Sequence, residues 1–98
     1  MELPQTDAPL AQALVITRTM LDAAQRQDWQ QVADMEAVRA PLLHRQHPQD
    51  AGSHAQLGEL LAYDRELQAL VGQARDEAAG RWQREHGRAQ AIAAYAQS

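Results

Sequence analysis

Residues 57–82 have the sequence LGELLAYDRELQALVGQARDEAAGRW, and this stretch decides the fold. Its apolar positions recur at alternating steps of three and four, which places them along one face of an α-helix. The stripe comprises Leu57, Leu60, Leu61, Asp64, Leu67, Val71, Ala74, Ala78 and Trp82, with Asp64 as its one polar member. A near-heptad pattern over about 25 residues predicts a long helix that packs lengthwise in a bundle at shallow crossing angles.

The start of this helix is marked by a loop and a capping residue. Residues 47–52, HPQDAG, are turn formers and predict the clearest loop in the chain. Ser53 follows, with Gln56 three residues further on. Because Ser with Gln at this spacing is a variant of the capping box, we expect the helix to begin at Ser53.

The end of the long helix depends on its glycines. Gly72 and Gly80 each weaken a helix by about 1 kcal/mol relative to Ala, so we expect the helix to continue through both. Gly87 is the better candidate for a break. The Ala-rich residues 88–97 then predict a short C-terminal helix, which is too short to be stable alone and must dock or fray.

A first helix is predicted before residue 25. We expect residues 1–7 to be a disordered lead-in, with Asp7 as N-cap and Pro9 in the first turn, where its missing N–H costs nothing. The helix should stop within residues 25–27. Its apolar stripe is wide and comprises Leu10, Ala13, Leu14, Ile16, Thr17, Met20, Leu21, Ala23 and Ala24.

A second helix is predicted from the capping residue Asp28, with Gln31 at the third helical position. Pro41 must kink this helix or end it near Ala40, because proline cannot donate a backbone hydrogen bond; we expect a kink. The inward positions are Trp29, Val32, Met35 or Glu36, Arg39 and Leu43, a stripe that is polar in its middle.

Together these elements predict an all-α fold. The turn before Asp28 is short, so the first two helices should be antiparallel neighbours. We expect one domain spanning residues 1–98, an antiparallel three-helix bundle with one long third helix and a short C-terminal helical segment. Phe is absent and Ala supplies much of the hydrophobic fraction, so the core should be thin.

Composition excludes several functional classes. Nine Arg and no Lys face 13 acidic residues, for a net charge of −4, which argues against nucleic acid as a ligand. The absence of Cys excludes disulfides and thiolate chemistry and fits a cytoplasmic protein. The N-terminus is acidic where a signal peptide is basic, and no apolar run approaches the roughly 20 residues of a membrane span.

No pattern in the chain indicates an enzyme, a metal site or a cofactor. His44, His47 and His54 lie on both sides of the Pro/Gly loop and lack the spacing of metal ligands on one helical face, so we interpret them as surface residues. Ser53 and Ser98 are the only serines, a cap and a terminal residue, and neither suits a hydrolase nucleophile.

Polar residues at inward positions are more informative, and they have two interpretations. Glu36, Arg39 and Asp64 either form a buried charge network that fixes which helix lies against which, or line a solvent-accessible groove. An Arg39–Asp64 pair is the favoured interpretation, because a lone charge is rarely tolerated in a core. The groove remains the alternative.

The predicted long helix is also longer than its two neighbours, so they cannot cover its C-terminal part. Trp82 and Tyr95 lie in this late part, where they either cap the bundle against the C-terminal segment, which would dock through Ile92 and Tyr95, or belong to an apolar surface for a partner helix. The residues that we expect to bind a partner are Leu60, Leu67, Val71, Ala74, Ala78 and Trp82.

Three segments together resemble the FliT-type flagellar export chaperones. These are residues 28–43, with an acidic-aromatic start, a Glu and a pair of leucines; residues 60–77, which include LLAYDREL and the charged RDE; and the Ala-Ala-Tyr of residues 93–95. The resemblance covers roughly residues 10–96 in the family's order and spacing. The chain printed here ends three residues after Tyr95, so we expect only a short tail compared with the family's C-terminal helix.

The resemblance implies a cytoplasmic chaperone of the flagellar type III export system. It would bind the C-terminal segment of the filament-cap protein and also contact the export ATPase complex and the export gate. The alternative hypothesis is a structural helical-bundle homodimer or adaptor without chaperone activity, because the same apolar surface could pair with a second copy.

Overall fold

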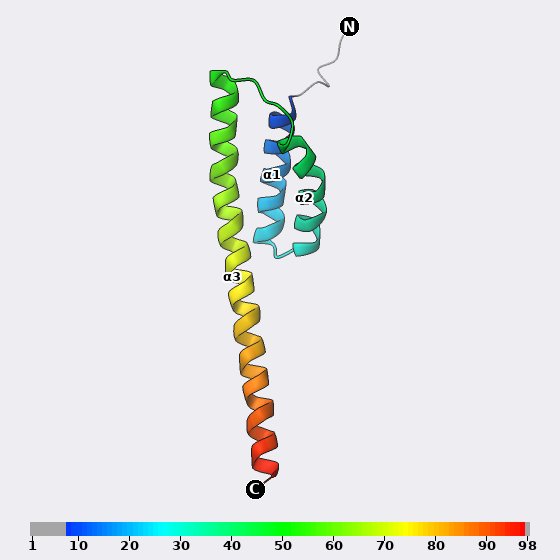
Figure 1. Cartoon of the computed structure of the whole chain (residues 1–98), viewed down its shortest axis with the longest axis vertical. Helices are drawn as coiled ribbons and strands as arrows, with labels where there is room; N and C mark the ends of the chain where they lie inside the picture. The colour runs from blue at the N-terminus through cyan, green and yellow to red at the C-terminus, as the bar shows by residue number, and fades with distance from the viewer. Residues whose placement is uncertain (1–7, 98) are drawn as a thin grey trace.

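The computed structural model describes residues 8–97, and the regular structure of these residues is entirely helical (Figure 1). Within that range lie three helices, α1 (Pro9–Gln25), α2 (Trp29–Leu43) and α3 (Ala51–Ala96). The predicted all-α class is therefore confirmed. The predictions of a lead-in over residues 1–7 and of an N-cap at Asp7 lie outside the described residues.

The chain runs along α1, returns along α2 and runs back along α3, so that α1 lies between the other two helices (Figure 1). α1 packs closely against both α2 and α3. Over residues 8–97, in contrast, no Cα atom of α2 comes within 8 Å of a Cα atom of α3. The helices thus form an arrangement that is open along the side where α2 and α3 face each other.

The core lies along α1 because this helix has neighbours on two sides. One cluster joins Leu10, Ala13 and Leu14 of α1 to Leu60 of α3. The second joins Met20, Leu21 and Ala24 of α1 to Leu67 of α3, and half-buried side chains of α2 pack against it, Trp29 and Val32 among them. Each fully buried Leu or Met stabilises the fold by about 1.5–3 kcal/mol, so few side chains carry most of the stability.

The two ends of the α1–α2 connection follow local capping rules. The Asp28 carboxylate accepts a hydrogen bond from the backbone N–H of Gln31 at 3.2 Å, which confirms the predicted N-cap. Gln27 has a φ of 62°, in the left-handed region, and allows the Asp28 N–H to donate to the Ala23 carbonyl at 2.9 Å. This closed turn sets α2 against α1. α2 continues through Pro41 to Leu43, so it does not end near Ala40.

The predicted start of α3 at Ser53 is wrong, because Asp50 is the N-cap. The Asp50 carboxylate accepts a hydrogen bond from the backbone N–H of Ser53 at 2.7 Å. Asp satisfies the free N–H groups of a first turn as well as Ser does, and here it lies early enough to add Ala51 and Gly52 to the helix. Hydrogen bonds from Ser53 lower the pKa of the Asp50 carboxyl.

The predicted break at Gly87 and the separate C-terminal helix are also wrong. α3 is a single helix of 46 residues that passes through Gly80 and Gly87. A glycine costs about 1 kcal/mol within a helix, but each further residue of a helix that is already nucleated adds a hydrogen bond, and the flanking alanines are the strongest helix formers. At about 1.5 Å per residue α3 is about 69 Å long, whereas α1 is about 26 Å long.

The C-terminal part of α3 therefore extends beyond the rest of the molecule (Figure 1). We call residues 79–96 the overhang. All residues from 81 to 97 are exposed. The molecule measures 80 × 24 × 21 Å along its principal axes, and the overhang accounts for the elongated shape.

Candidate functional site: the groove between α2 and α3

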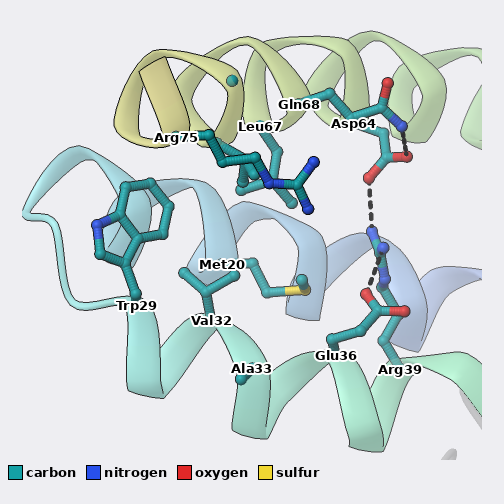
Figure 2. Close-up of a pocket in the computed structure, with 12 residues that line it drawn as sticks. Met20, Trp29, Val32, Ala33, Glu36, Arg39, Asp64, Leu67, Gln68 and Arg75 are labelled. Carbon is teal, nitrogen blue, oxygen red and sulfur yellow. Dashed lines mark hydrogen bonds and ion pairs between the residues drawn. The ribbon is translucent and has the colours of Figure 1, made fainter. Parts of the chain in front are cut away.

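An open groove with a volume of about 540 Å³ lies between α2 and α3, and α1 lies behind it in Figure 2. It exists because the two outer helices are too far apart for their side chains to fill the space between them. We call it the α2–α3 groove. Its lining comprises Met20 of α1; Trp29, Val32, Ala33, Glu36 and Arg39 of α2; and Asp64, Leu67, Gln68, Val71, Gly72 and Arg75 of α3.

One part of the groove is apolar. Met20 lies at its floor between Val32 and Leu67, and the indole of Trp29 stands at one end (Figure 2). Met20 and Leu67 are buried, whereas Trp29 and Val32 are only half-buried. The half-buried side chains leave apolar surface that a second polypeptide could cover.

The other end of the groove is closed by charges. The Arg39 guanidinium donates to the Asp64 carboxylate of α3 at 3.0 Å, and it also donates to the Glu36 carboxylate within α2 (Figure 2). The Arg39 side chain is 8% exposed, compared with 24% for Asp64 and 46% for Glu36. The buried Arg39 guanidinium is thus paired with two carboxylates that keep contact with solvent.

Thr17 connects this network to α1. Its hydroxyl accepts a hydrogen bond from Arg39 at 3.1 Å and donates one to the Ala13 carbonyl at 2.7 Å. Thr17 is completely buried. Arg39 therefore holds α1, α2 and α3 together at one level and sets the width of the groove.

The two sequence-based interpretations of Glu36, Arg39 and Asp64 describe the same place. The structure joins the three side chains in a network, and that network lines an accessible groove. Thr17 was not predicted as part of it. The sequence did contain a signal for Thr17, because it is a hydroxyl residue at an inward position of an otherwise apolar stripe. A buried hydroxyl needs a hydrogen-bond partner.

Beyond Trp29 the groove continues as a shallow apolar hollow with a volume of about 290 Å³. It is lined by Trp29, Val71, Ala74, Arg75 and Ala78. Val71 and Ala74 are half-buried and Ala78 is exposed. The apolar face of α3 thus extends from the groove as far as Ala78, next to the start of the overhang.

Trp82 lies further along the same helix and is 62% exposed. Its ring stacks on the ring of His86, with centroids 4.7 Å apart and planes 8° apart. This contact is within one turn of α3, so it holds the indole against its own helix and leaves its outer side free.

Two of the six residues expected to bind a partner lie in the core instead. Leu60 is 3% exposed and Leu67 is 5% exposed, because α1 packs on that face of α3. The predicted docking of the C-terminal segment through Ile92 and Tyr95 is wrong. These side chains are 62% and 85% exposed, since a continuous α3 carries them away from the rest of the molecule.

The groove holds no constellation for metal binding. Among residues 8–97, no three His, Asp or Glu side chains are grouped so that they could hold a metal ion. Over the same residues, no helix combines the length and apolar character that crossing a bilayer requires. What the arrangement offers is a binding surface with an apolar floor and a charged end.

Comparison with known protein families places the chain beside one of them. The family described as "Flagellar protein FliT" matches residues 8–97, which include all three helices and the groove. No curated protein and no solved structure matches the chain.

Proposed function

This chain belongs to the FliT family of flagellar proteins, and from that premise we propose that it is a flagellar export chaperone. In this proposal the α2–α3 groove binds the C-terminal helical segment of the filament-cap protein, and the chaperone delivers it to the export apparatus through the export ATPase complex and the export gate. It acts in the cytoplasm by binding alone, without catalysis or a cofactor.

The observation that carries the proposal is the half-covered apolar surface formed by Trp29, Val71, Ala74 and Ala78. An amphipathic helix with apolar side chains at steps of three and four residues suits such a surface, because its own apolar face needs a similar partner. Each square ångström of apolar surface removed from water contributes about 25 cal/mol before ordering costs. The net charge of −4 favours a basic or neutral client.

Val71 is the position at which to test this. It contributes to both the groove and its apolar continuation, and it is only half-buried in the free protein. Val71→Asp would place an unpaired carboxylate against the bound helix, so we expect at least a hundredfold loss of affinity for the cap-protein segment. The measurement is isothermal titration calorimetry with the purified chain and that segment.

The matched control is Ala69→Asp. Ala69 is exposed and lies two residues from Val71, which puts it on the opposite side of α3. Ala69→Asp adds the same charge to the same helix as Val71→Asp does. Its affinity for the cap-protein segment and its circular dichroism spectrum should therefore match those of the unmodified chain. Absence of cap-protein binding by the unmodified chain, or an equal loss in both variants, would refute the proposal.

A structural homodimer or adaptor without chaperone activity is the second candidate function. The observation in its favour is the overhang, which no other part of residues 8–97 covers. This function predicts self-association and no affinity for the cap-protein segment, so the titration above separates the two.

A further inference from the structure

Arg75 places a charge over the apolar part of the α2–α3 groove. Its guanidinium is directed over the floor of the groove, where Met20 and Leu67 lie (Figure 2). The Arg75 side chain is exposed, and within residues 8–97 it takes part in none of the ion pairs. The groove therefore presents a positive charge with no counter-charge beside the surface that a client helix would cover.

The side chains around Arg75 cannot supply that counter-charge. Trp29 and Val32 of α2 line the same groove, and both are apolar. The hollow beyond Trp29 is lined, apart from Arg75, by apolar side chains, Trp29, Val71, Ala74 and Ala78. A client helix bound at this level would meet a cation in otherwise apolar surroundings.

The charge network at the other end of the groove does not neutralise Arg75 either. Asp64, the carboxylate of the network on α3, lies eleven residues before Arg75, which is about 16 Å along the helix. This separation exceeds the Debye length of about 8 Å at physiological ionic strength. Asp64 and Glu36 are also both paired with Arg39. The carboxylates of the groove are thus already engaged, and they lie too far away to compensate Arg75.

A helix that binds in the groove would remove water from the Arg75 guanidinium. Taking a charge out of water is costly unless an opposite charge with good hydrogen-bond geometry replaces the water. A carboxylate meets this need best, because its two oxygens can accept two parallel hydrogen bonds from one guanidinium. The aliphatic part of the Arg75 side chain can at the same time pack against apolar side chains of the client.

We propose that Arg75 is a specificity determinant of the groove and pairs with an Asp or Glu that interrupts the apolar face of the client helix. The inference rests on the proposed function, since it names a chemical feature of the helix that the groove binds. In that helix the acidic residue lies three or four positions from apolar residues, so that all of them face the groove. The net charge of −4 acts at long range on the client as a whole, whereas Arg75 acts on the residue in contact with it.

A double-mutant cycle across the interface tests this pairing by isothermal titration calorimetry with the full chain. Each acidic residue of the cap-protein segment is changed in turn to its amide, Asp to Asn or Glu to Gln. We expect one of these changes to raise the Kd for the unmodified chain about tenfold. Arg75→Gln should raise the Kd for the unmodified segment by a similar factor. The Arg75→Gln chain should then bind that amide segment and the unmodified segment equally well, because the pair is already broken.

The matched control is Arg84→Gln, which removes the same charge from α3. Arg84 lies nine residues beyond Arg75, on the opposite side of the helix and outside the groove lining. Its Kd for each segment should stay within about twofold of that of the unmodified chain. Circular dichroism of both variants establishes that α3 remains helical.

The titrations separate failure of this inference from failure of the proposed function. The inference alone is overturned if the chain binds the segment but Arg75→Gln has no larger effect than Arg84→Gln. It is equally overturned if no amide change weakens binding, or if the losses from Arg75→Gln and from the amide change multiply. Absence of binding by the unmodified chain would overturn the proposed function, and this inference with it.

Discussion

The charge network beneath the groove makes a quantitative prediction about stability. Arg39→Met removes the guanidinium that joins α1, α2 and α3 while keeping much of the side-chain volume. The variant loses a charge-assisted hydrogen bond to Asp64, one to Glu36 and one to the Thr17 hydroxyl. We expect the free energy of unfolding to fall by about 2 kcal/mol.

The magnitude follows from the exposure of each partner. A hydrogen bond to a charged group contributes about 1.5–3 kcal/mol, and the bond to Asp64, which is 24% exposed, belongs toward the lower part of that range. The bond to Glu36, which is 46% exposed, contributes about 0–1 kcal/mol because water can replace it. Thr17 keeps its hydrogen bond to the Ala13 carbonyl and so loses little.

A double-mutant cycle isolates the Arg39–Asp64 pair. Asp64→Leu alone leaves the buried guanidinium with only Glu36 and Thr17, and we expect a loss of about 2 kcal/mol. The double variant Arg39→Met, Asp64→Leu replaces the pair with apolar side chains and should lose only about 1 kcal/mol. The coupling between the two positions is then about 3 kcal/mol.

The assay is urea unfolding followed by far-UV circular dichroism, with every variant at the same protein concentration. With a slope of about 1–3 kcal/mol per molar urea, a 2 kcal/mol loss moves the midpoint by about 1 M. The reasoning is refuted if Arg39→Met changes stability by less than about 0.5 kcal/mol, or if the losses of the two single variants simply add.

Two further predictions concern the core and the start of α3. Leu67→Ala should lower the free energy of unfolding by about 2–4 kcal/mol, because Leu67 is 5% exposed between α1 and α3; Leu61→Ala, at a position 46% exposed, should change it by less than about 0.5 kcal/mol in the same urea assay. Hydrogen bonds from Ser53 lower the pKa of Asp50, so its stabilisation of the first turn is present above the ordinary pKa near 3.9 and is lost as the pH falls through the lowered value. NMR of the Ser53 amide should follow that titration, and Asp50→Asn should abolish it; a pKa at or above the ordinary value would contradict the cap.

Local sequence patterns were sufficient to place the helices. Errors arose at helix ends, where two nearby residues suited the same capping role or where a glycine suggested a break. Asp28 with Gln31 located the start of α2 because an N-cap depends on residues four positions apart at most. Asp50 and Ser53 both suit an N-cap, and the stripe from Leu57 onward does not distinguish them. Gly87 failed as a break because its cost is small compared with the hydrogen bonds that continued helix forms.

By itself the sequence determined that the chain is helical, which face of each helix is apolar, and that charged residues sit on inward positions at Glu36, Arg39 and Asp64. Only the tertiary structure decided that α1 lies in the middle, that α2 and α3 stay apart, and that Ile92 and Tyr95 remain exposed. The physical reason is that periodicity reports the direction of a side chain around its own helix, whereas the helix that covers it is chosen by packing between residues distant in sequence. Leu60 and Val71 belong to one stripe, yet α1 packs on Leu60 whereas Val71 faces the open α2–α3 groove, so Leu60 is buried and Val71 is only half-buried.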